Sequence, residues 1–186
     1  MPLATPKTWV VGEVVDAAEL NTEVRAQFQS IIDDYQFVKK TADEPLPSSA
    51  TLQNDNHLLG SMAANAKYLV IARLAVNGPS GGDFKMAWTM PTGTTVSQRF
   101  CRGPAVSSAS STADTTVRSS GINGGHLVEI NYGLFTTGTQ SFIEEILHVE
   151  TAGTAGTCQL RWAQNISSAT ATTVELGSWL EIRRVA

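Results

Sequence analysis

The sequence predicts a mainly β protein, an antiparallel sandwich of two sheets preceded by a short strand and one N-terminal α-helix. From Thr51 onward, apolar and polar residues alternate in short segments, which is typical of strands with one buried face. Charged residues make up only 16% of the 186 residues, and turns rich in Gly, Ser and Thr separate the segments, as in all-β proteins. A chain of this length can bury a full hydrophobic core.

The apolar run at Trp9–Val11 predicts the short strand, and a helix is predicted over about residues 17–34. Asp16 and Glu19 form a capping-box pattern at the helix start. Five apolar residues then follow at intervals of four, four, three and four, which places them on one stripe. Because a single helix of this length is marginal in water, the stripe must pack on something. We expect it to dock into another protein or into copies of itself; packing on its own sandwich is the alternative. The expected anchor residues are Trp9, Val11, Leu20, Val24, Phe28, Ile31 and Tyr35.

Three regions follow from this pattern. Residues 1–42 are expected to form the anchor, and residues 43–50 lie in a charged, proline-containing stretch that reads as a linker. Residues 51–186 are expected to form the sandwich.

Eight or nine strands are predicted in the sandwich, with no helix between them. Their number suits a jelly roll, although an immunoglobulin-like order stays open because spacing does not fix topology. The last two strands, around Cys158–Ala163 and Val174–Arg183, are expected to pair as a hairpin. The others are expected at Thr51–Leu59, Ala66–Asn77, Asp83–Met90, Thr94–Arg102, Asp114–Arg118, His126–Phe135 and Ser141–Thr151.

Two of these strands are partly apolar on both faces, which predicts a second cover from another copy of the chain. Trp179 falls on the outward register of the last strand, where an indole also calls for cover. One of Glu144 and Glu145 is expected either to face a partner chain and pair with Arg161 or Arg183, or to face solvent. The predicted subunit interface comprises Leu69, Ile71, Arg73, Phe142, Ile146, Arg161 and Trp179.

The search for catalytic, metal and cofactor motifs is negative, so we expect no enzyme and no cofactor. Glu144 and Glu145 are strand neighbours that point to opposite faces and cannot form a dyad. His57, His126 and His148 are isolated, and Cys101 and Cys158 read as free core cysteines rather than a disulfide.

The formal net charge of −4, with scattered basic residues, disfavours nucleic acid as a partner. No apolar run approaches the ~20 residues that a membrane span needs. We therefore expect neither nucleic-acid binding nor membrane insertion.

Three segments carry a family resemblance: TWVVGEVVDAAELNTEVRAQFQSI, the middle stretch with TLQNDNHL and DFKMAWTMPTGTT, and LRWAQN with SSATATTVELGSWLEIRRVA. Together they resemble minor tail, fibre or head-decoration proteins of actinobacterial tailed phages and prophages. The resemblance implies a virion structural protein that is assembled in the host cytoplasm, with a jelly-roll head similar to the TNF and C1q type. It also implies a homotrimer that binds other proteins of the capsid or tail.

The Ser/Thr/Gly-rich stretch Pro104–Gly125 allows a second reading. It forms either plain surface loops or an exposed rim that touches a host surface glycan. A receptor-binding fibre head is therefore the alternative to a structural appendage.

Overall fold

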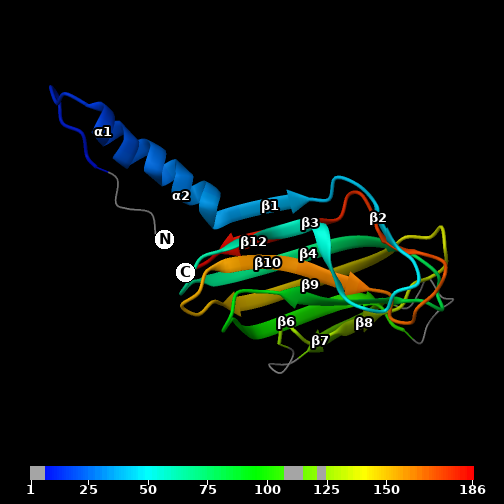
Figure 1. The fold of residues 1–186 in the computed structure, drawn as a ribbon. Helices are drawn as coiled ribbons and strands as arrows, with labels where there is room; N and C mark the ends of the chain where they lie inside the picture. Colours follow the sequence, from blue (N-terminus) through cyan, green and yellow to red (C-terminus); the bar gives the residue numbers. More distant parts are fainter. Residues whose placement is uncertain (1–6, 107–114, 121–124) are drawn as a thin grey trace.

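The computed structural model describes residues 7–106, 115–120 and 125–186. These residues form two antiparallel sheets packed face to face, with one N-terminal helical segment that stands away from them (Figure 1). The predicted two-sheet sandwich is confirmed.

The described residues contain twelve strands, eight in a large sheet and four in a small sheet. The large sheet has the order β1-β12-β4-β9-β6-β7, with β11 beside β4 and β2 beside β11, and the small sheet has the order β3-β10-β5-β8. The strands of the large sheet are β1 Tyr35–Lys39, β2 Glu44–Leu46, β4 Lys67–Asn77, β6 Thr95–Pro104, β7 Thr115–Ser120, β9 Ser141–Glu150, β11 Thr172–Val174 and β12 Trp179–Arg184. Those of the small sheet are β3 Gln53–Met62, β5 Phe84–Thr89, β8 Ile130–Tyr132 and β10 Gly156–Ala163.

Connections cross repeatedly between the two sheets. Among the described strands, β6 and β7 are the only neighbours in sequence that also pair with each other. This crossing favours the jelly roll over an immunoglobulin-like order, which joins several neighbouring strands by hairpins within one sheet. The predicted C-terminal hairpin is wrong, because β10 pairs with β3 and β5 in the small sheet whereas β12 pairs with β1 and β4 in the large one.

The core lies between the sheets. The predicted inward face of β4 is buried along its whole length, from Tyr68 to Val76. Trp88 and Trp162 of the small sheet are fully buried opposite it. Burial of each large apolar side chain stabilises the fold by about 1.5–3 kcal/mol.

Residues 35–46 differ from the expected anchor and linker. β1 pairs with β12 over its full length, and β2 pairs with β11. Lys40 is completely buried and Glu44 is only 8% exposed. Lys40 and Glu44, whose charges suggested a solvated linker, instead find partners on β3. The sandwich therefore begins at Tyr35.

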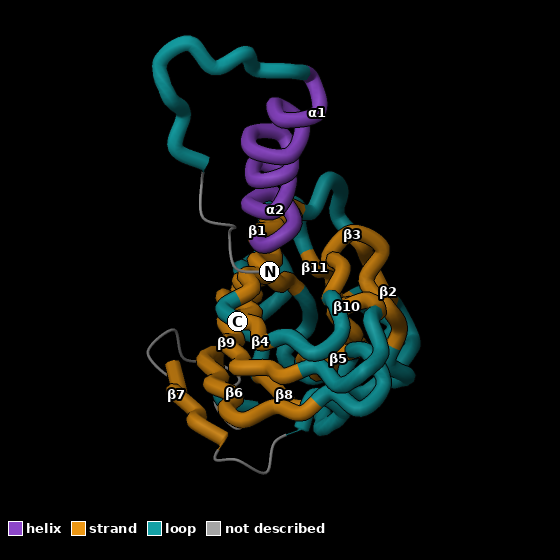
Figure 2. The backbone as a smooth tube through the Cα atoms, turned by 90° about the vertical axis from the view of Figure 1, so that its left-hand side faces the viewer, coloured by secondary structure: helices purple, strands orange, loops and turns teal. Residues whose placement is uncertain are grey.

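The helical segment consists of α1 (Ala17–Leu20), a π-helical turn (Asn21–Arg25) and α2 (Ala26–Asp34). The predicted capping box is present: the Glu19 amide donates to Asp16, and the Asp16 amide donates to the Glu19 carboxylate. α2 passes into β1 without a loop, and Figure 2 shows the helix clear of both sheets.

The short strand predicted before the helix is not formed by the described residues 7–16. The chain turns there instead, with the Glu13 amide donating to the Val10 carbonyl and Gly12 at a φ of +86°. None of the described helices has the length and hydrophobicity that a membrane span requires.

Candidate functional site

The helix carries an uncovered apolar stripe. None of its residues is buried, and Phe28 is 63% exposed. Self-packing, the alternative considered for this helix, is therefore not what the structure shows. The predicted anchor residues Trp9, Val11, Leu20, Val24, Phe28, Ile31 and Tyr35 are all exposed.

Lys7 ties the segment before the helix to the helix itself. Its ammonium contacts Glu13 and lies 2.6 Å from Oε1 of Glu19, and its amide donates to Oε2 of Glu23 at 3.0 Å. Its Nζ also lies 4.7 Å from the centre of the Trp9 ring. Hydrogen bonds to Glu13 and Glu19 raise the pKa of Lys7 above its ordinary value. The segment from Trp9 to Val15 is thereby held beside the helix with its apolar side chains outward.

The second apolar surface is the outer face of the large sheet, the face directed away from the core. Six of the seven predicted interface residues lie on it, in rows set by the strand register. One row joins Trp179, Arg73 and Glu144, and the next joins Ile71 and Ile146. Leu69 and Phe142 lie on the same face. Arg161 does not belong to this group, because it lies on β10 of the small sheet.

A hollow of about 550 Å³ opens on this outer face. Its side chains are aromatic at two points, Trp179 and Phe142, and charged at three, Arg73, Arg102 and Glu144. The Trp179 ring packs against Phe37 with 5.3 Å between centroids, and the Arg73 guanidinium lies 5.3 Å from the indole centre. The chain therefore covers Trp179 in part, which reduces but does not remove its exposed area.

Within the described part of one chain, Glu144 and Glu145 have partners other than Arg161 and Arg183. Glu144 accepts a hydrogen bond from Nε of Arg73 at 2.5 Å, across the β4–β9 pair, rather than from Arg161 or Arg183. Glu145 points to the other face and is completely buried.

Glu145 is the centre of a buried polar cluster that joins the two sheets. Its carboxylate accepts two hydrogen bonds from Arg99 at 3.0 Å, one from Trp88 at 2.8 Å and one from Tyr132 at 2.7 Å. Burial and the Glu145 charge raise the pKa of Cys101 to about 11, and the same two causes raise the pKa of Tyr132 far above its ordinary range. The Glu145 carboxylate has its hydrogen-bond partners within the protein and is closed to solvent. The cluster therefore holds the two sheets together.

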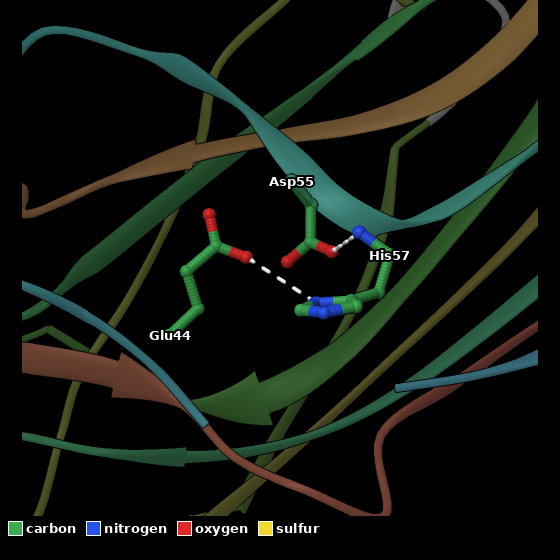
Figure 3. A group of neighbouring side chains, drawn as sticks. All are labelled: Glu44, Asp55 and His57. Atoms are coloured by element: carbon green, nitrogen blue, oxygen red, sulfur yellow. Dashed lines mark hydrogen bonds and ion pairs between the residues drawn. The ribbon is translucent and has the colours of Figure 1, made fainter. Parts of the chain in front are cut away.

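A second polar cluster contains Glu44, Asp55 and His57, whose side chains point toward one another (Figure 3). Their ligand-type atoms lie within 4.8 Å of one another, a spacing that would suit a metal ion. However, the Nζ of Lys40 already lies 2.7 Å from Glu44, 2.6 Å from Asp55 and 3.3 Å from His57. The cation of this cluster is therefore the lysine ammonium, and a metal ion would have to displace it.

Sequence reasoning missed both polar clusters and three outer-face residues, Phe37, Arg102 and Glu181. A signal existed for Asp55 and His57, since they stand two apart in a predicted strand and so share one face. Lys40 and Glu44 lie in a proline-containing stretch without apolar periodicity, and this pattern predicted a linker rather than buried side chains.

Comparison with known proteins identifies no family and only distant structural similarity. No family model matches the chain, and no curated protein matches it. Among solved structures, the tripod from the baseplate of bacteriophage Tuc2009 matches at 14% identity over 98% of this chain and 79% of that chain, with a TM-score of 0.33.

Two structures of infectious bursal disease virus also match. One, of the Gt strain, matches at 9% identity over 81% of this chain and 40% of that chain, with a TM-score of 0.21. The other, the VP2 subviral particle, matches at 10% identity over 82% of this chain and 37% of that chain, with a TM-score of 0.19. The chain is thus distantly similar to components of viral particles, at TM-scores too low to carry an argument about its function.

Proposed function

We propose that this protein is a non-enzymatic structural protein of a phage virion. Its N-terminal helix anchors it to another protein of the capsid or tail, and its sandwich assembles as a trimer through the outer face of the large sheet. The resemblance of three sequence segments to tail, fibre and decoration proteins supports the virion assignment. Assembly is the mechanism, since each copy leaves apolar surface that a neighbour must cover.

The observation that carries the proposal is the stripe on the helix. Leu20, Val24, Phe28 and Ile31 are each at least 43% exposed although they follow one another along one side of the helix. An apolar stripe of this kind is stable in water only when another surface buries it. Because α2 continues directly into β1, force on the anchored helix would pass straight into the sandwich.

The experiment compares two single substitutions in phage particles. Phe28→Glu places a charge in the stripe, whereas Ala26→Glu places the same charge roughly 200° around the helix axis. Ala26 is exposed and its substitution removes no contact of a large side chain. We expect the Phe28→Glu protein to be absent from purified particles and the Ala26→Glu protein to be present at the normal level, as measured by immunoblot against the major capsid protein. Normal incorporation of the Phe28→Glu protein would refute the anchor.

The alternative function is a receptor-binding head that holds a host glycan. Its predicted rim falls largely on residues 107–114 and 121–124, which lie outside the described residues. What favours it is the hollow, which combines the aromatic rings of Trp179 and Phe142 with the charged groups of Arg73, Arg102 and Glu144. Sugar rings stack on aromatic faces while their hydroxyls bond charged groups. Binding to a glycan array that is lost on Trp179→Ala would favour this function.

A further inference from the structure

We infer that the outer face of the large sheet forms a head-to-tail contact in which Glu181 of one copy pairs with Arg102 of the next copy. The inference rests on the proposed trimer. It adds which residues meet across each contact, Glu181 from one copy and Arg102 from its neighbour. It follows from two charges on this face for which the described residues provide no ion pair.

Glu181 is the first of these charges. It lies on β12, where the register sets it between Phe37 of β1 and Ile71 of β4. It is partly buried, and within the described residues it makes no ion pair. Arg183, two residues further along the same strand, is exposed and does not bond it. The Glu181 carboxylate is therefore available to a cation from another copy.

Arg102 is the second charge. The register places it directly opposite Glu144, but Glu144 is already bonded to Arg73 on its other side. Glu144 therefore pairs with Arg73 and not with Arg102, although both arginines line the hollow. The Arg102 side chain is exposed, and no ion pair of Arg102 is present in the described part of the chain.

One copy cannot bring these two charges together. Glu181 is on β12 and Arg102 is on β6, and strands β4 and β9 lie between them. Three strand spacings correspond to roughly 14 Å, whereas an ion pair needs its charged atoms within about 4 Å. Two copies can bring these charges together, whereas the described residues of one chain leave them apart.

The surroundings of the two charges suit such a contact. Glu181 lies beside Phe37, which is 52% exposed, and the hollow that contains Arg102 is edged by Phe142, which is 69% exposed. When the β12 side of one copy meets the β6 side of the next, these rings are buried together and the opposite charges fix the register. Each copy contributes Glu181 to one neighbour and Arg102 to the other, and this head-to-tail contact forms a closed trimer when the rotation between neighbouring copies is about 120°.

A charge-swap experiment tests the pair. Glu181→Arg and Arg102→Glu are made singly and together in the full-length chain, and association is measured by sedimentation equilibrium. Each single substitution is expected to raise the dissociation constant on the order of tenfold or more, and the double substitution to restore association to near the wild-type value. Arg161→Glu on the small sheet is the matched control and should leave association unchanged, since Arg161 lies away from the outer face.

The outcomes separate this inference from the proposed function. If the wild-type chain associates but the double variant associates no better than the singles, the pair is wrong and the trimer stands. The same conclusion holds if both single variants associate like the wild type. If the wild-type chain is a monomer, both the Glu181–Arg102 pair and the proposed trimer are wrong. Far-ultraviolet circular dichroism on each variant excludes misfolding, and Glu181→Gln with Arg102→Gln repeats the test if a reversal unfolds the chain.

Discussion

Lys40 and Asp55 form an ion pair that is fully enclosed by the protein, with 2.6 Å between Nζ and Oδ2. The same Asp55 carboxylate accepts hydrogen bonds from the Trp162 indole at 3.1 Å and from the amides of His57 and Leu58 at 2.9 and 2.8 Å. Lys40 follows β1, whereas Asp55 lies on β3 and Trp162 on β10. This pair therefore connects the chain that follows the helix and β1 to the opposite sheet.

Lys40→Met should destabilise the fold strongly. It keeps most of the side-chain volume but leaves the buried carboxylates of Asp55 and Glu44 without their cation, a loss of about 3–5 kcal/mol. Urea denaturation measures the change, with Lys39→Met as the control because Lys39 is exposed and its loss should cost no more than about 0.5 kcal/mol. Equal midpoints for the two variants would show that the buried pair does not stabilise the fold.

Glu145→Gln and Glu144→Gln make a second matched pair. The first removes a buried charge that bonds Arg99, Trp88 and Tyr132, and should lower the free energy of unfolding by about 3 kcal/mol or more. The second removes a surface pair with Arg73, whose side chain is 61% exposed, and should cost about 1 kcal/mol or less. The reverse ranking in thermal unfolding would contradict the inward placement of Glu145.

His126 should make stability depend on pH. Burial and the nearby Arg99 charge lower its pKa below the ordinary value of 6.5. Below pH 6.5 the unfolded chain binds a proton at His126 more readily than the folded chain does. The contribution of the neutral His126 to the free energy of unfolding is therefore fully present above pH 6.5, and it is lost as pH falls through the lowered pKa. Unfolding free energies of the wild type and His126→Asn, compared from about pH 7.5 to about pH 5.5, should converge toward acid. A difference that is constant or grows toward acid would show that the protonated ring is tolerated.

The two cysteines should be unreactive in the folded protein. Both are buried and free, burial and Glu145 raise the pKa of Cys101 to about 11, and burial alone raises the pKa of Cys158. Because the thiolate is the reactive form, a thiol reagent at about pH 8 should label neither cysteine until urea is added. Rapid labelling of one cysteine in the native state would contradict its placement in the core.

Sequence reasoning predicted the strands and their faces better than their partners. The alternation in Tyr68–Val76 correctly separated buried from outward residues, because burial acts on each strand locally. The same alternation at Leu160 and Leu180 could not show that these residues belong to different sheets, since pairing depends on crossings between distant parts of the chain.

For the candidate surfaces too, the sequence predicted local patterns but not contacts between distant strands. The helix stripe was visible in the spacing of Leu20, Val24, Phe28 and Ile31, and six interface residues do share one face. Arg161 was grouped with them because its sheet was unknown. The roles of Lys40 and Glu145 depend on side chains brought in by other strands, and such contacts have no periodic signature.

The most direct test of the central claim is the mass of the full-length protein in solution by light scattering at micromolar concentration. Since one chain leaves the helix stripe exposed and the outer face of the large sheet only partly covered, we predict three times the mass of a single chain. A mass equal to one chain would show that these surfaces stay uncovered, and it would contradict the assembly on which the proposed function depends.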